Sequence, residues 1–269
     1  MKHYYPVLTI AGSDSSGGAG IQADIKTMSA LGTYGMSAIT AITAQNTTGV
    51  SAIQGVLPKV VEAQIDMVYA DIRPLSVKTG MLYNGEIIKS VADALARNNA
   101  ENIIIDPVMI ATSGARLIDE DAVEILVKQL LPMATLITPN KNEAVALTDS
   151  EDVAVQAQRL HEMGARNVLL KGGDSSRNDV KIDYLSLENS TKLIEIKSDA
   201  IDTQNSHGTG CTLSAAIASY LALGNSLEKS VKKAKLYITR ALFAGKNAKV
   251  GEGHGPVNHF FAPQKLKVR

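Results

Sequence analysis

Short runs rich in valine, isoleucine and leucine alternate along this chain with longer segments that carry apolar residues at helical spacing. The short runs predict buried strands, and the longer segments predict helices with one apolar face. This alternation predicts a mostly parallel sheet with helices on both faces, a three-layer α/β/α sandwich. The predicted strands are Val7–Ala11, Ser37–Ala44, Ser76–Thr79, Ile103–Asp106, Leu136–Thr138 and Val168–Lys171, and the predicted helices are Ile21–Leu31, Lys59–Ala70, Glu86–Ala96, Ala122–Leu131 and Val153–Met163.

The pattern changes in the last third of the chain. Two apolar runs, Ile182–Leu187 and Lys192–Ile196, flank the polar sequence E-N-S-T and predict an antiparallel hairpin at the sheet edge. Two further helices are predicted at Thr212–Leu223 and Leu227–Phe243, followed by an irregular tail rich in Gly, Pro and His. No long linker or internal repeat divides the sequence, so we expect one domain over residues 1–269.

Composition narrows the class of protein. Basic and acidic side chains balance at 27 each, which gives no support for a nucleic-acid or membrane-surface partner. One cysteine excludes an intramolecular disulfide, and no Cys/His cluster suggests zinc. No apolar run approaches ~20 residues and the N-terminus lacks a signal peptide, so we expect a soluble cytoplasmic protein.

Polar and glycine residues stand at the ends of the predicted parallel strands. In open α/β sheets the ligand crevice lies outside the carboxyl ends of the strands, so these residues should border one cleft. They are Ala11-Gly12, Gln45-Asn46, Thr79-Gly80-Met81, Asp106-Pro107, Pro139-Asn140 and Lys171-Gly172-Gly173.

Two glycine-rich segments could bind phosphate. The first, A-G-S-D-S-S-G-G-A-G at Ala11–Gly20, has neither dinucleotide-fingerprint spacing nor the Lys-Ser/Thr pair of a Walker loop. It is either a flexible loop or a wall of a small-molecule pocket. The second, H-G-T-G-C-T at His207–Thr212, precedes an Ala-rich helix and predicts an anion site of backbone N–H groups, unless it is a plain helix start capped by threonine. Cys211 there is expected to be a low-pKa thiolate, the alternative being a small buried hydrophobe.

Ordered motifs then carry a resemblance to a known family. They are T-I-A-G-S-D-S-S-G-G-A-G-I-Q-A-D-I-K-T, A-Q-N-T-T-G-V, K-T-G-M-L, D-P-V-M, I-T-P-N-x-x-E-A, L-K-G-G and H-G-T-G-C-T-L-S-A-A. Together, from Leu8 to Val257, they resemble the hydroxymethylpyrimidine/phosphomethylpyrimidine kinases of thiamine biosynthesis, in the ribokinase-like superfamily. The resemblance implies a ribokinase-like fold, two successive ATP- and Mg²⁺-dependent phosphorylations of an aminopyrimidine alcohol, and a homodimer.

The resemblance also implies roles for particular residues. The pyrimidine pocket would fall on Gly12, Asp24, Gln45, Met81 and Val108. The Gln45 amide both donates and accepts, which suits an aminopyrimidine edge. Asp24 would accept from the amine or orient the hydroxymethyl group, but it could instead be a first-turn helix carboxylate, and Met81 could be ordinary core packing.

The nucleotide side of the site is implied in the same way. Asn140 and Glu143 of N-x-x-E would organise Mg²⁺, with Asp106 helping to hold the cation and Lys171 reaching the phosphates as a mobile charge. Gly208, Thr209, Gly210 and Cys211 would form the catalytic turn. Many ribokinase-like enzymes have aspartate at the last of these positions, and the pyrimidine and related pyridoxal kinase branches have cysteine.

Three alternatives stay open at this point. A pyridoxal kinase shares the cysteine-bearing turn, although Gln45 within A-Q-N-T-T-G-V favours the pyrimidine. A catalytically silent nucleotide-binding module is disfavoured by the presence of Glu143, Lys171 and Cys211. A dinucleotide-dependent oxidoreductase is disfavoured by the broken glycine fingerprint.

Overall fold

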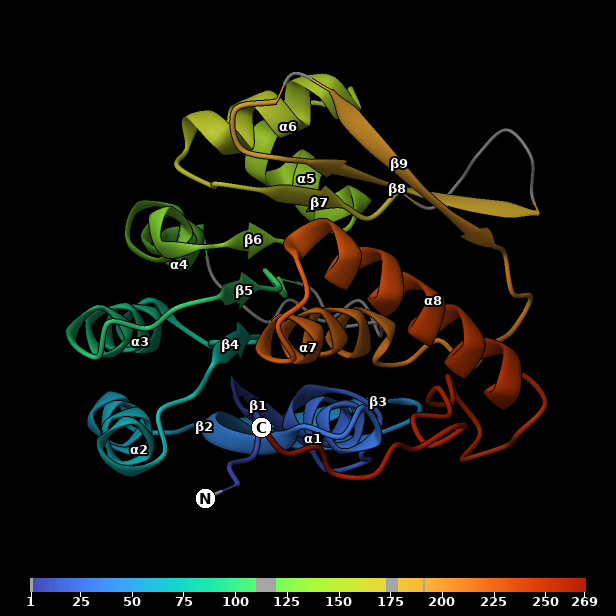
Figure 1. Ribbon diagram of the computed structural model, residues 1–269, viewed down its shortest axis with the longest axis horizontal. Helices are drawn as coiled ribbons and strands as arrows, with labels where there is room; N and C mark the ends of the chain where they lie inside the picture. Colours follow the sequence, from blue (N-terminus) through green and yellow to red (C-terminus); the bar gives the residue numbers. More distant parts are fainter. Residues whose placement is uncertain (1, 110–119, 173–178, 191) are drawn as a thin grey trace.

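A nine-stranded sheet forms the centre of the protein in the computed structural model, which describes residues 2–109, 120–172, 179–190 and 192–269 (Figure 1). The strand order is β3-β2-β1-β4-β5-β6-β7-β8-β9. The six strands from β2 to β7 in this order are parallel, and β3, β8 and β9 pair antiparallel at the two edges. The strands are β1 (Pro6–Asp14), β2 (Tyr34–Asn46), β3 (Gly49–Gly55), β4 (Ser76–Thr79), β5 (Ile103–Ile105), β6 (Leu136–Ile137), β7 (Val168–Leu170), β8 (Val180–Ser186) and β9 (Leu193–Asp199).

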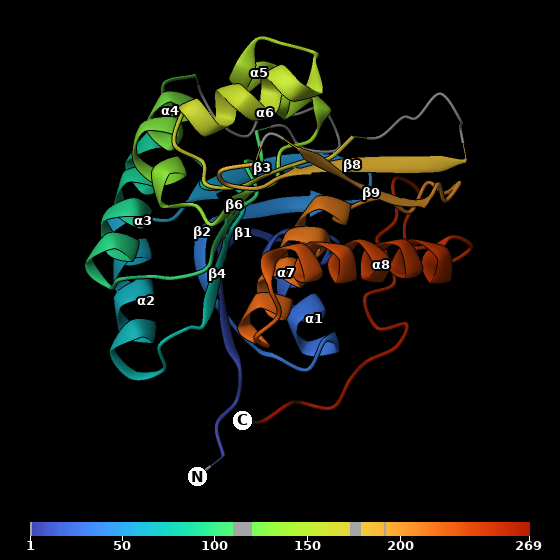
Figure 2. The same ribbon diagram turned by 45° about the horizontal axis from the view of Figure 1, so that its top comes forward.

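Helices cover both faces of this sheet, as Figure 2 shows. One apolar cluster joins one face to α2, α3, α4, α5 and α6, and a second joins the other face to α1, α7 and α8. The expected three-layer sandwich with a mostly parallel sheet and an edge hairpin is therefore confirmed. The helices are α1 (Gly20–Ala30), α2 (Pro58–Asp71), α3 (Gly85–Arg97), α4 (Glu120–Ile125) with its π-helical and 3-10 continuations η1 (Leu126–Leu130) and η2 (Leu131–Met133), α5 (Lys141–Thr148), α6 (Val153–Glu162), α7 (Thr209–Ala222) and α8 (Leu227–Gly245).

Local capping explains where several of these helices begin. Pro58 takes the first position of α2, where its missing N–H leaves no helical hydrogen bond unmade. Side-chain oxygens of Asn84, Asn140 and Asp152 accept backbone N–H groups at the starts of α3, α5 and α6.

Among the differences from the sequence prediction, three concern whole elements or the position of Cys211. Strand β3 was not predicted; the Asn46 side chain accepts the N–H groups of Thr48 and Gly49, and this tight turn sends the chain back along β2. Helix α5 was also missed, because its eight residues are too few to show helical periodicity. Helix α7 begins at Thr209, three residues before the predicted start, so Cys211 lies in its first turn.

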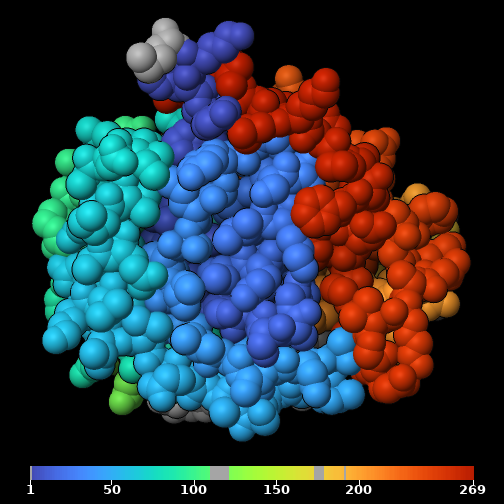
Figure 3. Space-filling model, turned by 90° about the horizontal axis from the view of Figure 1, so that it is seen from below, coloured from blue at the N-terminus to red at the C-terminus, as the bar shows by residue number. Residues whose placement is uncertain are grey.

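The two ends of the described chain lie side by side. His3 and Arg269 exchange backbone hydrogen bonds of 2.9 and 2.8 Å, and Tyr4 bridges Val268. Figure 3 shows the C-terminal segment against the N-terminal residues on one face. Among the described helices, none is both long and apolar enough to span a bilayer.

Candidate active site

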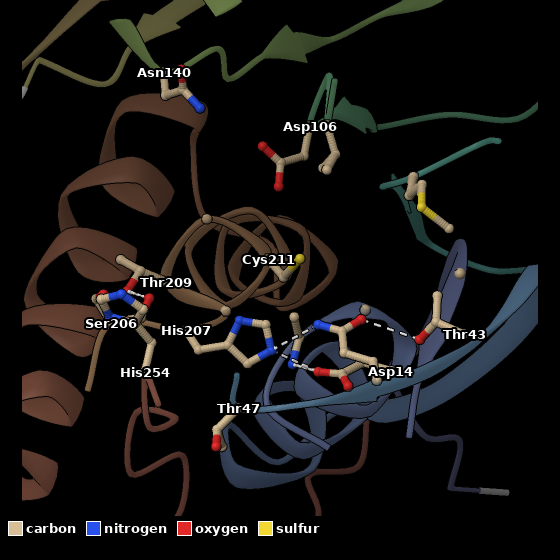
Figure 4. Close-up of a pocket in the computed structure, with 18 of the residues that line it drawn as sticks. Asp14, Thr43, Thr47, Asp106, Asn140, Ser206, His207, Thr209, Cys211 and His254 are labelled. Atoms are coloured by element: carbon tan, nitrogen blue, oxygen red, sulfur yellow. Dashed lines mark hydrogen bonds and ion pairs between the residues drawn. The ribbon is translucent and has the colours of Figure 1, made fainter. Parts of the chain in front are cut away.

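A cavity of about 660 Å³ opens at the carboxyl ends of the parallel strands. The ends of β1 and β2, the segments that follow β4, β5, β6 and β7, and the start of α7 form its lining, as the strand-end pattern predicted. Figure 4 shows Asp14 and Thr43 on one side, Asp106 and Asn140 on another, and His207 and Cys211 between them. Among the predicted site residues, those that line the cavity are Gly12, Gln45, Met81, Asp106, Val108, Asn140, Glu143, Lys171, Gly208, Thr209, Gly210 and Cys211.

The turn before α7 leaves backbone N–H groups open to the cavity. Gly208 is the N-cap, with a φ of 79° and no side-chain hydrogen bond capping the helix. A Cβ at this position would overlap the carbonyl oxygen of Gly18, so only glycine allows the two glycine-rich segments to touch. Thr212 does not act as a cap: its hydroxyl lies 3.1 Å from His259 Nε2. Gly210 and Cys211 line the cavity, and their first-turn amides lie before the first intrahelical acceptor, as an anion site would require.

Cys211 lines the cavity, but its thiol is not acidic. Burial raises its pKa to about 11, although Lys78 and a backbone hydrogen bond from Gly20 act in the opposite direction. The expectation of a depressed pKa is wrong, because the loss of hydration at this site outweighs the nearby cation and the Gly20 hydrogen bond. At neutral pH the group is a thiol.

Lys171 is paired and not a free, mobile charge. Its Nζ lies 2.9 Å from Asp106 Oδ1, and the lysine side chain is only 16% exposed. Asp106 also contacts the hydroxyls of Thr138 at 3.2 Å and Ser214 at 3.3 Å. Burial raises the pKa of Asp106, but the positive charges of Lys171 and Lys78 outweigh it and lower the pKa. The carboxylate is thus ionised and fixes Lys171 in place.

The Lys171–Asp106 ion pair lies against the catalytic turn at Gly210. A Cβ on Gly210 would be 3.3 Å from Lys171 Nζ and 3.5 Å from Asp106 Oδ2. The lysine cation and the first-turn amides therefore converge on one part of the cavity, where they can stabilise the same negative charge.

Asn140 and Glu143 form a reciprocal capping box at the start of α5. Asn140 Oδ1 accepts the Glu143 N–H at 2.9 Å, and Glu143 Oε2 accepts the Asn140 N–H at 2.8 Å. Glu143 is buried and is not a solvated residue on the surface of the helix. Burial raises its pKa to about 7, despite the opposing charge of Lys171.

The carboxylates of Asp106 and Glu143 suit a hard cation that takes its remaining ligands from water and phosphate. The described residues contain no group of three or more His, Cys, Asp or Glu side chains able to hold a metal alone. Asp106 and Glu143 both line the cavity, and Mg²⁺ commonly takes one or two protein carboxylates together with water and phosphate oxygens. The donor set therefore fits Mg²⁺ bound jointly with a nucleotide.

Asp24 is the predicted site residue that does not line the cavity. Its side chain is fully buried, with Oδ2 2.8 Å from Lys78 Nζ and 2.6 Å from Thr9 Oγ1. The expected contact with the pyrimidine amine is therefore replaced by an internal ion pair, since the side chain is buried away from the cavity and Lys78 and Thr9 both bind its Oδ2.

Sequence reasoning missed two residues at the centre of the site, Asp14 and His207. His207 Nε2 lies 2.8 Å from Asp14 Oδ2 and 3.3 Å from the amide nitrogen of Gln45 (Figure 4). Signals were present, because Asp14 is the one charged residue of the first glycine-rich segment and His207 precedes G-T-G-C. What the sequence lacked was the contact between two segments 193 positions apart.

Comparisons with known proteins agree with this geometry. A family model described as phosphomethylpyrimidine kinase matches residues 14–258. The chain is 48% identical to the thiamine biosynthesis bifunctional protein ThiED of Geobacter sulfurreducens over 98% of this chain, and it spans only 54% of that longer protein. It is 47% identical to the hydroxymethylpyrimidine/phosphomethylpyrimidine kinase of Rhizobium meliloti, with 94% of this chain and 96% of the relative covered. The solved pyridoxal kinase from Staphylococcus aureus in complex with AMP-PCP and pyridoxal is 36% identical, with a TM-score of 0.85 over 96% of this chain and 94% of its own.

Proposed function

Because the chain belongs to the phosphomethylpyrimidine kinase family and has a ribokinase-like fold, we propose that it phosphorylates 4-amino-5-hydroxymethyl-2-methylpyrimidine with ATP, first to the monophosphate and then to the diphosphate. The observation that carries this proposal is the convergence of Gln45, Cys211 and the Lys171–Asp106 pair on one cavity. It joins a group that can read an aminopyrimidine edge to groups that can stabilise a transferring phosphoryl group.

Positioning and electrostatics account for most of the chemistry. Phosphoryl transfer spreads negative charge over the equatorial oxygens of the moving group, and fixed donors stabilise that charge without reorganising. The amides of Gly210 and Cys211 and the ammonium group of Lys171 supply these donors. Asp106 and Glu143 would hold Mg²⁺, which when bound neutralises charge on the nucleotide phosphates. Gly12, Met81 and Val108 would form the walls around the pyrimidine ring.

The two phosphorylations differ in what they require of Cys211. In the first, the attacking hydroxyl must lose its proton, and the Cys211 sulfur is the group in the catalytic turn that can accept it. Because the thiol has a pKa of about 11, only its small thiolate fraction can act as this base at neutral pH. In the second, the nucleophile is a phosphate monoester with a second pKa near ~6, which is already largely dianionic at pH 7 and loses no proton.

Product analysis by mass spectrometry tests the proposed function. The protein is incubated with ATP, Mg²⁺ and either the aminopyrimidine alcohol or pyridoxal, and the phosphorylated species are counted. We expect the pyrimidine to gain first one and then a second phosphoryl group. A matched sample of Lys171→Met should give little of either product, because the fixed cation of the anion site is lost. Absence of phosphorylated pyrimidine with the unsubstituted protein would contradict the proposal.

Pyridoxal kinase activity is the second candidate. It is favoured by the TM-score of 0.85 to the Staphylococcus aureus pyridoxal kinase and by the shared fold over 96% of this chain. The higher identity to the Rhizobium meliloti kinase, 47% against 36%, ranks the pyrimidine first. The pyridoxal arm of the same experiment distinguishes the two, since a pyridoxal kinase would phosphorylate pyridoxal in preference to the pyrimidine.

The wider organisation of the enzyme belongs to the same proposal. We infer that residues 1–269 act as one kinase domain, that two copies associate as a homodimer, and that the enzyme works in the cytoplasm with free ATP and Mg²⁺. Limited proteolysis tests the domain organisation, sedimentation equilibrium tests the dimer, and cell fractionation tests the location.

A further inference from the structure

Asp14 is an ionised carboxylate held by many donors. Its two oxygens accept hydrogen bonds from the backbone N–H groups of Ser16, Gly18 and Ala19, from the Ser16 hydroxyl and from His207. A protonated carboxyl group would turn a hydrogen toward one of these donors, so the arrangement requires the charged form. Burial raises the pKa of Asp14, but the hydrogen bonds from His207, Ser16 and Ala19 outweigh it and hold the pKa well below its usual range.

The charge on Asp14 fixes the proton of His207. His207 Nε2 lies 2.8 Å from Asp14 Oδ2, and both side chains are less than one-tenth exposed. A bare ring nitrogen would place two acceptors against each other, so Nε2 carries a hydrogen and donates it. His207 therefore presents an N–H group, and not a lone pair, to its neighbourhood.

The Gln45 amide lies between this donor and Thr43. In the structure its nitrogen is 3.3 Å from His207 Nε2 and its oxygen is 3.1 Å from Thr43 Oγ1. That orientation sets two N–H donors face to face. It also asks the Thr43 hydroxyl, which has one hydrogen, to donate to both Gln45 and the Ser13 carbonyl oxygen 2.8 Å away. A half turn of the amide removes the contact between two N–H donors and leaves Thr43 to donate to Ser13 alone, because Nε2 then donates to Thr43 and Oε1 shares the His207 Nε2–H with Asp14 Oδ2 in a three-centre hydrogen bond.

We propose that Asp14 and His207 are positioning residues that lock the Gln45 amide with its oxygen toward His207, and that this lock selects 4-aminopyrimidines against 4-oxopyrimidines. The inference rests on the proposed function, because it assigns the reading of the pyrimidine edge to Gln45. With one oxygen lone pair and one N–H used by His207 and Thr43, the amide keeps one lone pair and one N–H for the cavity.

The order of the free oxygen lone pair and the free N–H on the Gln45 amide matches the edge of a 4-aminopyrimidine and opposes that of a 4-oxopyrimidine. A 4-aminopyrimidine presents an amine donor at position 4 and an acceptor at ring N3, whereas a 4-oxopyrimidine presents an acceptor and then an N–H donor. The group at position 4 is next to the carbon that carries the hydroxymethyl group, so it points toward the reacting side. His207 directly precedes Gly208 of the catalytic turn, whereas Thr43 lies in β2, so the amide oxygen held by His207 is on the side of the reacting group and accepts from the amine. A freely turning amide would accept either ring.

The ratio of kcat/KM for 4-amino-5-hydroxymethyl-2-methylpyrimidine to that for its 4-oxo analogue tests the lock. One well-formed two-point contact is worth ~1–3 kcal/mol of discrimination, so the unsubstituted enzyme should prefer the amino compound by about 5- to 150-fold. His207→Leu removes the N–H donor and should bring the ratio below about 3, with activity on the 4-oxo compound unchanged or raised. His207→Gln keeps an N–H at a similar reach toward Asp14 and should restore most of the ratio.

Thr43→Val tests the same lock from the other end of the amide and does not depend on His207→Leu folding. It removes the hydroxyl acceptor and should also lower the ratio. Equal losses on both substrates in His207→Leu and Thr43→Val, with the ratio unchanged, would show a purely structural role and overturn the inference. No preference in the unsubstituted enzyme would overturn it as well. Turnover of neither pyrimidine would be a different result, because it would overturn the proposed function itself.

Discussion

Lys78 Nζ lies 2.8 Å from Asp24 Oδ2, and neither side chain has any exposed surface. Lys78 projects from β4 and Asp24 from α1, so the pair joins the sheet to the helix beneath the catalytic turn. Burial lowers the pKa of Lys78, but the Asp24 carboxylate outweighs it and raises the pKa. The same charges reach Cys211, where Lys78 lowers the pKa of the thiol and Asp24 raises it. The pair therefore holds α1 against β4 and also influences the pKa of Cys211.

Asp24→Asn should destabilise the protein strongly. It leaves the Lys78 ammonium buried without a counter-charge, and breaking a buried pair from one side typically costs ~3–5 kcal/mol. Urea unfolding monitored by circular dichroism gives the free energy of unfolding. The double variant Asp24→Asn/Lys78→Met removes both charges and should recover most of the loss. A cost below ~1 kcal/mol for Asp24→Asn alone would show that the pair is not essential to the framework.

Cys211→Ala should affect the two phosphorylations unequally. The first needs a proton acceptor, whose removal typically costs ~10²–10⁴-fold, and we expect the low end because the thiol is a poor base at neutral pH. The second has a dianionic nucleophile and should change by less than about 3-fold. Steady-state kinetics with the alcohol and with its monophosphate separate the two steps. Cys211→Ser keeps a group of similar size without the acidity and should behave like Cys211→Ala, whereas equal losses in both steps would remove the base role.

The reactivity of Cys211 should follow its raised pKa. Only the thiolate reacts with iodoacetamide, so with a pKa of about 11 the alkylation rate should rise about tenfold per pH unit from pH 7 to pH 9.5. Because the sequence has one cysteine, intact-protein mass spectrometry reports this site alone, and Cys211→Ala provides the blank. A rate that levels off between pH 7 and pH 8 would mean that the helix terminus outweighs burial after all.

The sequence predicted the layers of the fold and most of the cavity lining, because both depend on short-range patterns. Strand periodicity predicted the parallel sheet, and the residues at or just after the strand ends, such as Gln45 and Lys171, necessarily meet at one edge. The electrostatic state of the site could not be predicted in this way. The pKa of Cys211, the pairing of Lys171 with Asp106 and the withdrawal of Asp24 from the cavity all depend on burial and on neighbours distant in sequence.

His259 should make the protein sensitive to acid. Its ring is buried and lies 3.1 Å from the Thr212 hydroxyl in the first turn of α7, and burial, with a smaller effect of Lys26, lowers its pKa to about 4. Since the folded pKa lies below the unfolded value of about 6.5, the stability that this group contributes is complete above pH 6.5 and is lost as the pH falls toward 4. The full loss in the free energy of unfolding is roughly 3 kcal/mol, because one pKa unit corresponds to 1.36 kcal/mol.

Urea unfolding between pH 7 and pH 4 should show this loss in the unsubstituted protein and much less of it in His259→Gln, which keeps a polar contact for Thr212 but does not titrate. His3, whose side chain is exposed, provides the matched control, and His3→Gln should leave the pH dependence of stability unchanged. If His259→Gln loses stability with falling pH as steeply as the unsubstituted protein, then a different group controls the acid sensitivity.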